Sequence, residues 1–162
     1  MGSSLPLVLW YVSIQVVSAA VLFVTGYLVY AQPAAHHRRE FVAYVAVQAG
    51  WLLVATAKFL VGTPELKYAL SLLTDLLAVA AIASLGYFAT VYTNRSLSLR
   101  RPQNAAFAVW LIVAVGGVLT QPVLGLQYDS VTYHQEPIAY LATSPGPTYL
   151  LNVAVAAVVV SV

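Results

Sequence analysis

Cysteine is absent from the 162-residue sequence, and charged side chains are rare. The lack of cysteine excludes disulfide bonds, iron–sulfur ligation and thiolate chemistry. Aspartate, glutamate, lysine and arginine make up 7% of the residues, whereas a soluble domain carries about 25%. So few charges cannot cover a surface that faces water, and 61% of the residues are hydrophobic. The composition therefore indicates a membrane protein.

Common signatures of enzymes are also absent from the sequence. It contains no glycine-rich phosphate-binding loop, no His-Glu-x-x-His motif and no recognisable pairing of a nucleophile with a base. The net charge of +2 is too small and too localised to indicate a nucleic-acid partner. We therefore expect no catalysis by this chain, no cofactor and no nucleic acid, and membrane lipids are the partners that the composition implies.

Long apolar runs predict the fold class. A spanning helix needs about 20 mostly apolar residues, because the hydrocarbon core is about 30 Å thick and each residue rises about 1.5 Å. Helices are expected because the runs are continuous and lipid requires every backbone group to be paired within its segment. We predict an all-α, polytopic transmembrane helix bundle with at least four full spans and a truncated fifth, at about residues 5–31, 41–62, 66–92, 105–120 and 148–162.

Basic residues between the runs predict the orientation. Arg38 and Arg39 separate the first two runs, and Arg95, Arg100 and Arg101 separate the third from the fourth. Cytoplasmic loops carry an excess of lysine and arginine, so both segments are expected in the cytoplasm of a multi-pass protein of the cell membrane. The N-terminus is then outside. The fifth run stops on apolar residues without a polar flank, which predicts a truncated helix that continues toward the cytoplasm.

The outer segment 121–147 is the longest stretch between the apolar runs. Its β-branched and aromatic residues around Val131 predict a short hairpin or an ordered cap. Asp129, His134 and Glu136 are potential ligands for a divalent cation, but their spacing is not diagnostic, and a loop exposed to solvent is the simpler interpretation. We predict no metal site, and we keep these three residues with Tyr128 as candidates for binding a ligand.

Lys58 and Asp75 are the two ionisable residues that fall inside predicted spans. Such residues are costly in lipid and indicate a functional site or a specific partner. Around the turn at Pro64 the two positions differ in height by only about 7 Å on antiparallel helices. We therefore predict that they face each other and form a polar ligand site. The alternatives are a lysine that extends to the outer surface and an aspartate that is protonated or bonded to a hydroxyl such as that of Thr56 or Thr74.

The order of features along the chain resembles a known family. A helix with a central Trp51 is followed by a polar turn at 63–67 and by a long helix that ends in the segment from Phe88 to Arg95. A shorter helix then ends at Thr120-Gln121-Pro122, and Gly146-Pro147 opens the next one. This order resembles the N-terminal seven-helix sensor region of archaeal and bacterial membrane histidine kinases, of which the chain would hold the first five helices.

The resemblance implies a receptor that biases a cytoplasmic kinase domain within a two-component system. It also implies a homodimer, and a response regulator as a partner only through a domain that this chain lacks. The phosphoacceptor histidine and the ATP-binding domain are missing, so kinase activity is not expected here. The family often carries Thr-Asn-x-x-His after the fourth helix, whereas this sequence has Thr120-Gln121-Pro122-Val123-Leu124, and no role of that histidine carries over.

Two other functions are compatible with an apolar helical chain. A fragment of a multipass transporter or channel would be favoured by glycine or proline breaks at mid-membrane, and only Gly50, Gly86 and Gly116-Gly117 are candidates. A retinal-type photoreceptor would use Lys58 for the Schiff base and Asp75 as its counter-ion. That alternative is weaker, because rhodopsins carry the lysine in their last helix.

Overall fold

The computed structural model describes residues 4–33, 36–93, 98–134 and 140–161. In these ranges the chain forms helices and one two-stranded antiparallel sheet. In chain order the elements are α1 (Ser4–Ala31), α2 (Arg38–Leu60), α3 (Pro64–Tyr92), α4 (Pro102–Leu119), α5 (Gln121–Leu124), β1 (Tyr128–His134), β2 (Tyr140–Pro145) and α6 (Pro147–Ser161).

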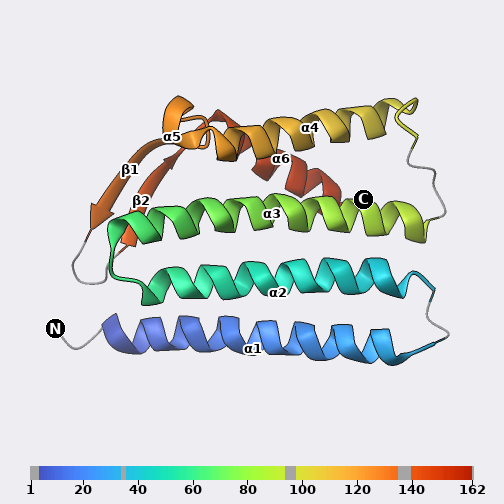
Figure 1. Ribbon diagram of the computed structural model, residues 1–162, viewed down its shortest axis with the longest axis horizontal. Helices are drawn as coiled ribbons and strands as arrows, with labels where there is room; N and C mark the ends of the chain where they lie inside the picture. The colour runs from blue at the N-terminus through green and yellow to red at the C-terminus, as the bar shows by residue number, and fades with distance from the viewer. Residues whose placement is uncertain (1–3, 34–35, 94–97, 135–139, 162) are drawn as a thin grey trace.

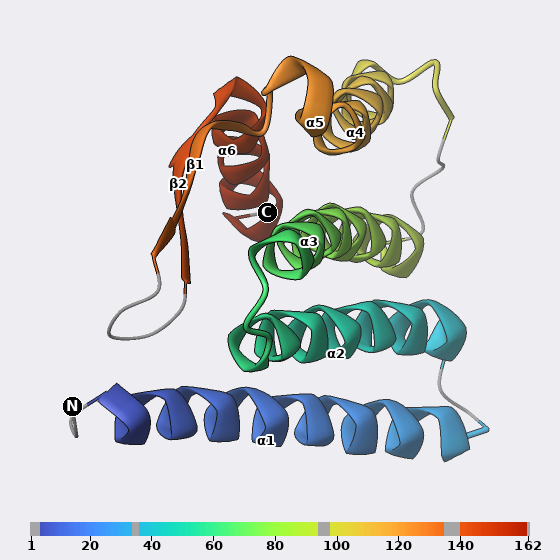
Figure 2. The same ribbon diagram turned by 60° about the vertical axis from the view of Figure 1, so that its left-hand side comes forward.

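The four long helices α1, α2, α3 and α4 are each long and apolar enough to cross a membrane, and α6 is a shorter apolar helix. Figure 1 shows α1, α2 and α3 side by side in sequence order, with α4 and α6 on the far side of α3. Figure 2 shows α3 between α2 on one side and the pair α4 and α6 on the other. The predicted all-α polytopic bundle is confirmed.

Apolar side chains cover the outside of this bundle. Leu60 is 70% exposed and Ile112 is 73% exposed, and α1 alone presents a long row of valine, leucine and aromatic side chains. Exposed apolar area on this scale does not suit water. Hydrocarbon is the solvent that accepts it, which agrees with the spans inferred from composition.

Several helices begin earlier than the apolar runs predicted. The α2 helix begins at Arg38 rather than at residue 41, and α4 begins at Pro102 rather than at residue 105. The hydropathy pattern marks only the part that suits hydrocarbon, whereas a helix pairs its own backbone groups and continues into the polar interface. Pro64 opens α3 at its first turn, where the missing N–H costs nothing. Thr63 precedes it without a side-chain capping bond.

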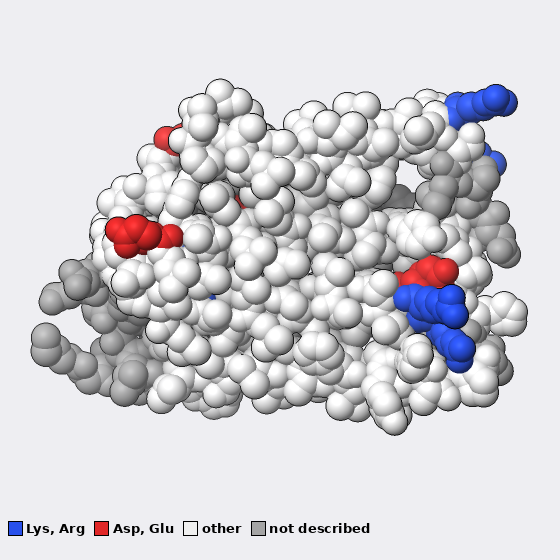
Figure 3. Space-filling model, viewed as in Figure 1, with Lys and Arg blue, Asp and Glu red and all other residues white. Residues whose placement is uncertain are grey.

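The two ends of the bundle differ in charge. Figure 3 shows arginine at the end where α1 joins α2 and α3 joins α4, with one acidic patch beside it. The residues there are Arg38, Arg39 and Glu40 at the start of α2, and Arg100 and Arg101 before α4. The opposite end carries acidic side chains in Figure 3, and Figure 1 shows the hairpin at that end. The described arginines of both predicted cytoplasmic segments therefore lie at the same end of the bundle, whereas Arg95 lies outside the described residues.

Close helix contacts form the core. Val79 of α3 packs with Trp110 and Ala114 of α4 in the main buried cluster. The indole Nε1 of Trp110 donates a hydrogen bond to Oδ1 of Asn152 in α6, at 3.1 Å. On the other side of α3, the hydroxyl of Thr56 in α2 donates to Oε1 of Gln15 in α1, at 2.7 Å. Hydrogen bonds between side chains therefore link α4 to α6 and α1 to α2.

The segment predicted as a hairpin or an ordered cap contains a one-turn helix, α5, and a hairpin of β1 and β2. The strands pair from Tyr128 opposite Pro145 to His134 opposite Tyr140. The hairpin lies beside the beginning of α3 (Figure 1). The hydroxyl of Tyr133 donates to the carbonyl of Gly62 in the turn between α2 and α3, at 2.7 Å. The ordered hairpin therefore contacts the ends of the spanning helices.

Candidate functional site

Asp75 is the polar centre of the site. It lies in α3, about three turns in from Pro64, and is partly buried. Its Oδ2 accepts a hydrogen bond from Nε2 of Gln127 at 3.2 Å and a second one from the hydroxyl of Tyr128. Both donors lie where the hairpin begins, more than 50 residues further along the chain. These two bonds join a spanning helix to the segment after α4 that contains α5, β1 and β2, which we call the cap.

Gln121 holds these two donors in place. Its Oε1 accepts the backbone N–H of Gln127 at 2.6 Å and that of Tyr128 at 3.0 Å, and its Nε2 donates to the carbonyl of Tyr128 at 3.0 Å. Gln121 is 6% exposed. The chain reaches this position because Gly125 follows α5 directly, and its φ of 62° belongs to the left-handed region that glycine adopts without strain.

The hydroxyl of Tyr128 stays protonated near neutral pH and therefore remains a hydrogen-bond donor. Burial raises the pKa of its hydroxyl, and the charge of Asp75 raises that pKa further. The protonated phenol therefore keeps its hydrogen for the carboxylate of Asp75. The ring of Tyr128 also lies near that of Tyr149 in α6, with a centroid separation of 6.4 Å.

A cavity of about 340 Å³ opens beside Asp75 between α2, α3, α6 and the start of the hairpin. Its wall consists of Trp51, Thr74, Asp75, Ala78, Val79, Ile82, Gln127, Tyr149, Asn152, Val153 and Ala156. Two buried polar atoms of this wall have no hydrogen-bond partner among the described residues, namely Nε1 of Trp51 and Oε1 of Gln127. A buried polar atom without a partner costs about 1–3 kcal/mol, so a guest that bonds to either atom is favoured.

Lys58 and Asp75, which were expected to face each other, are not joined directly in the structure, and Asp75 is bonded to a hydroxyl as the alternative allowed, although to that of Tyr128. Within the described ranges the two side chains form no ion pair, and Asp75 is bonded to Gln127 and Tyr128 instead. Lys58 remains near enough for its charge to act on Asp75. The reason for the difference is the return of the chain after α4, which brings neutral donors to the carboxylate and was not apparent from positions on two adjacent helices.

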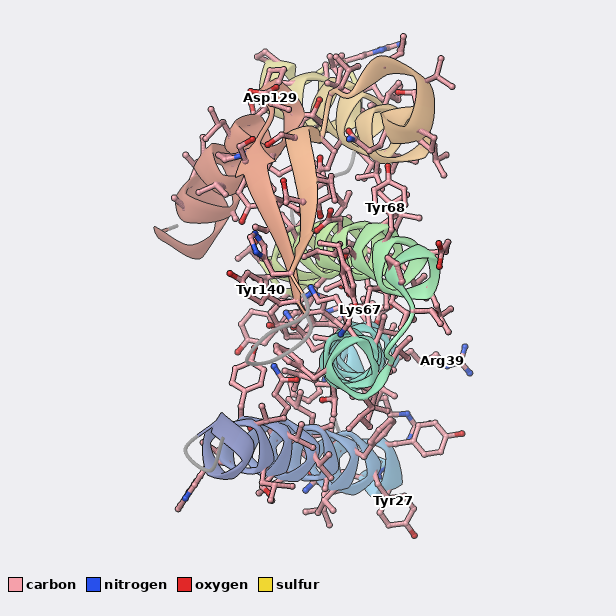
Figure 4. All side chains as sticks on the ribbon, turned by 90° about the vertical axis from the view of Figure 1, so that its left-hand side faces the viewer. Tyr27, Arg39, Lys67, Tyr68, Asp129 and Tyr140 are labelled. Atoms are coloured by element: carbon pink, nitrogen blue, oxygen red, sulfur yellow. The ribbon has the colours of Figure 1, made fainter. Side chains whose placement is uncertain are left out.

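Lys67 replaces Lys58 as the buried lysine. It lies in the first turn of α3 and is 2% exposed, although the sequence pattern placed it in the polar turn at 63–67. Its Nζ donates to the carbonyl of Lys58 at 2.7 Å, near the end of α2 (Figure 4). A cation at the C-terminal end of a helix satisfies a free carbonyl and opposes the negative end of the helix dipole.

The remaining candidates lie on the hairpin. Asp129 and His134 are exposed on β1, and the ring of His134 stacks on that of Tyr140 at 4.9 Å. Figure 4 shows Asp129 at the end of the hairpin opposite Tyr140. Glu136 lies outside the described residues. In the part of the chain that the structure describes, no three acidic or histidine side chains are grouped so as to hold a metal ion.

Asp75 and Tyr128 were candidates from the sequence, whereas Gln121, Gln127 and Trp51 were not proposed as site residues. A signal for the two glutamines was present, since amides directly after a span are costly unless they are bonded. The site holds a carboxylate, amides and aromatic side chains, and the residues that line it include no nucleophile with an adjacent base. Such a wall suits binding of a ligand rather than covalent chemistry.

A comparison with protein families identifies the family of this helical bundle. Residues 14–162 match the family described as the N-terminal 7TM region of histidine kinase. The chain belongs to this family. The match extends from α1 to the end of α6 and covers every residue of the site. Comparisons with curated proteins and with solved structures found no match.

Membership in the 7TM family supports a membrane-embedded sensory region, as the resemblance implied. The 7TM region of histidine kinases is not itself the catalytic part of those proteins. The sequence departs from the family pattern expected after the fourth helix, and at that place Gln121 organises the site. In this chain the hydrogen bonds of Gln121 therefore fix the backbone of Gln127 and Tyr128.

Proposed function

We propose that this 7TM region is a sensory domain of the cell membrane that relays a stimulus to a cytoplasmic histidine-kinase domain. The observation that carries the proposal is the pair of hydrogen bonds from Gln127 and Tyr128 to Asp75. These bonds connect the segment most accessible from one side of the membrane to a helix that spans the whole bilayer. A change at the hairpin is thereby passed to the position of α3.

The orientation follows from the separation of charge. The arginine-rich end belongs in the cytoplasm because cytoplasmic loops are enriched in basic residues. The hairpin and the cavity then lie toward the outside, where an external stimulus arrives. The long helix α3 begins at Pro64 and continues past Asp75 to Tyr92 at the arginine end, so one continuous element joins the sensing side to the output side.

Signalling requires two arrangements of this link. In one arrangement Tyr128 and Gln127 are bonded to Asp75, and in the other the cap is released and α3 takes a different position. A stimulus acts by binding one arrangement more tightly than the other. The output domain of a two-component receptor works as a homodimer and phosphorylates a response regulator, so the shift in α3 is read at the contact between two copies.

The rival functions receive no specific support. Each of the four long helices runs unbroken from its first to its last residue, without the mid-membrane interruptions that transporters use. The photoreceptor alternative needs Lys58 at the ligand, but Lys58 is not part of the cavity wall.

A substitution of Tyr128 tests the sensory proposal. In the protein that joins this region to its kinase domain, Tyr128→Phe removes one hydrogen bond to a charged partner, which is worth about 1.5–3 kcal/mol. We expect the basal autophosphorylation rate in nanodiscs, measured with radiolabelled ATP, to change by about tenfold or more, because each 1.4 kcal/mol changes an equilibrium tenfold.

Tyr140→Phe is the matched control. Tyr140 is 45% exposed at the far end of the hairpin and keeps its ring stacking in the variant. We expect its autophosphorylation to equal that of the unmodified protein. Equal rates in all three proteins would contradict the sensory role of the link between the cap and α3.

A further inference from the structure

Two hydrogen-bond acceptors beside the cavity, on Gln127 and Asp75, lack donors in the described part of the chain. Oε1 of Gln127 is a buried acceptor without a partner, and Gln127 is 2% exposed. Asp75 contributes a carboxylate whose Oδ1 accepts no hydrogen bond from the described residues, since both bonds formed by that side chain go to Oδ2. Two acceptors of one wall therefore need donors that the chain itself does not supply.

The rest of the wall suits a small apolar body. Ala78, Val79, Ile82, Val153 and Ala156 line the cavity from α3 and α6. Trp51 and Tyr149 add aromatic side chains, which attract cations when these lie over a ring face. A volume of about 340 Å³ lies at the lower end of the range for ligand pockets, which begins near 300 Å³. The occupant is therefore small and mostly apolar.

The charge of the occupant follows from Asp75. A carboxylate inside a span is costly unless a positive group or several donors compensate it. Gln127 and Tyr128 supply two neutral donors, and Lys58 acts on Asp75 without contacting it. A positive group that donates N–H bonds directly to the carboxylate completes this compensation, whereas water or an alcohol adds no charge.

We propose that this cavity binds a small organic ammonium ion, with its N–H groups directed to Asp75 and Gln127 and its apolar part against α3 and α6. This inference deepens the proposed sensory function, because it names the chemical class of the stimulus. The ammonium group binds next to the bonds between Asp75 and the cap. Its binding therefore competes with or reinforces the same link that joins the hairpin to α3.

Isothermal titration calorimetry of the full chain in phosphatidylcholine nanodiscs tests the proposal, with empty nanodiscs as the blank. The probes are n-butylammonium, n-butanol and tetramethylammonium, which have the same number of non-hydrogen atoms. Only the first has both a positive charge and N–H donors. We expect saturable binding of n-butylammonium at least about tenfold tighter than that of the other two, as expected for a charge-assisted hydrogen bond.

Equal binding of all three probes, or no saturable binding of n-butylammonium, would overturn the proposal. Tighter binding of tetramethylammonium than of n-butylammonium would also overturn it, since that result requires only a cation and aromatic rings. Binding of n-butanol alone would identify an apolar cavity in which Asp75 plays no part.

Two pairs of variants locate the binding site. Asp75→Asn removes the charge of the cavity wall, and Asp129→Asn removes an exposed carboxylate of the hairpin that does not line the cavity. Ala156→Leu adds three carbon atoms to the cavity wall and leaves the carboxylate of Asp75 in place, and Ala157→Leu adds the same atoms at an exposed neighbouring position. We expect the affinity for n-butylammonium to fall at least about tenfold in the first member of each pair only.

The Ala156→Leu variant keeps the test decisive if Asp75→Asn fails to fold. Unchanged affinity in Ala156→Leu, or an equal loss in Ala157→Leu, would place the amine elsewhere and overturn the site. The outcome is separate from that of the sensory proposal. If Tyr128→Phe alters autophosphorylation and no amine binds, the ligand class alone is wrong. If n-butylammonium binds and Tyr128→Phe has no effect on autophosphorylation, the sensory link is wrong.

Discussion

Single residues decide how closely the helices approach. Gly117 of α4 faces Thr148 of α6, and a Cβ atom added at Gly117 would lie 2.4 Å from the Thr148 Cγ2. Thr148 is itself buried, with 5% of its surface exposed, so it has no free space to move into. Small residues at such contacts let helix backbones pack in a membrane, where the hydrophobic effect contributes nothing to association.

Gly117→Ala is therefore expected to destabilise the protein by about 1–3 kcal/mol through overpacking. Gly116→Ala is the matched control, because a Cβ atom there meets nothing within 4 Å, and the gain in helix propensity is about 1 kcal/mol. The midpoint of unfolding in mixed micelles, compared for the two variants, measures the difference. A lower midpoint for Gly116→Ala than for Gly117→Ala would show that α4 and α6 do not meet at Gly117.

Individual residues were also where sequence reasoning succeeded and failed. Asp75 was identified as functionally important because a carboxylate in a span is costly. Lys58, which was expected to face it, is not bonded to it, and Lys67 was counted in the polar turn at 63–67 although it is buried. Spacing along two helices gives the height of a side chain in the bundle but does not show which other residues bond to it. In the structure the bonds to Asp75 come from Gln127 and Tyr128 of the cap.

At the scale of elements, the position of the cap depends on a close backbone contact at the base of the hairpin. The base of the hairpin is narrow, because the N–H of Gly146 donates to the carbonyl of Gln127 at 2.9 Å. A Cβ atom at Gly146 would lie 2.5 Å from the carbonyl oxygen of Leu126. The obstacle is backbone, which moves only with the whole turn. The position of Gln127 and Tyr128, and hence their bonds to Asp75, depends on this close approach.

Gly146→Ala is expected to loosen the hairpin while leaving the spans intact. Hydrogen–deuterium exchange of peptides covering β1 and β2 should become faster, and exchange within α2 and α3 should stay the same. Gly62→Ala serves as the control, because a Cβ atom there meets nothing within 4 Å. Unchanged exchange in the hairpin of Gly146→Ala would contradict the role of this contact.

The existence of the elements was largely predictable, whereas their exact ends were not. Continuous apolar runs predicted the four long helices, and β-branched and aromatic residues around Val131 predicted a strand. The α5 helix was missed because one turn of four residues has no periodicity to detect. The starts of α2 and α4 were placed too late, since hydropathy reports contact with lipid and not backbone conformation.

At the scale of the whole molecule, the arginine end and the hairpin end define a direction across the bilayer. The complete absence of cysteine makes this direction measurable without background. Asp129 is exposed on the hairpin, and Ser98 is exposed beside the arginines that precede α4. The two positions lie at opposite ends of the bundle.

Labelling of introduced cysteines with a membrane-impermeant maleimide is expected to separate the two ends. In intact cells Asp129→Cys should react, and Ser98→Cys should react only after lysis, because basic loops remain in the cytoplasm. The reverse pattern would invert the proposed orientation and place the cavity on the cytoplasmic side. Reaction of both variants after lysis controls for accessibility.

The sequence by itself determined the solvent, the spanning helices, the separation of charge and the resemblance to the histidine-kinase sensor region, because these depend on composition and on local runs of residues. The tertiary structure alone decided what Asp75 bonds to and where the cavity lies. Both depend on segments more than 50 residues apart, and no local pattern encodes which of them meet. Lys58 was the neighbour that spacing along two helices indicated, but the bonds to Asp75 come from the neutral donors Gln127 and Tyr128, whose backbone groups are bonded to Gln121.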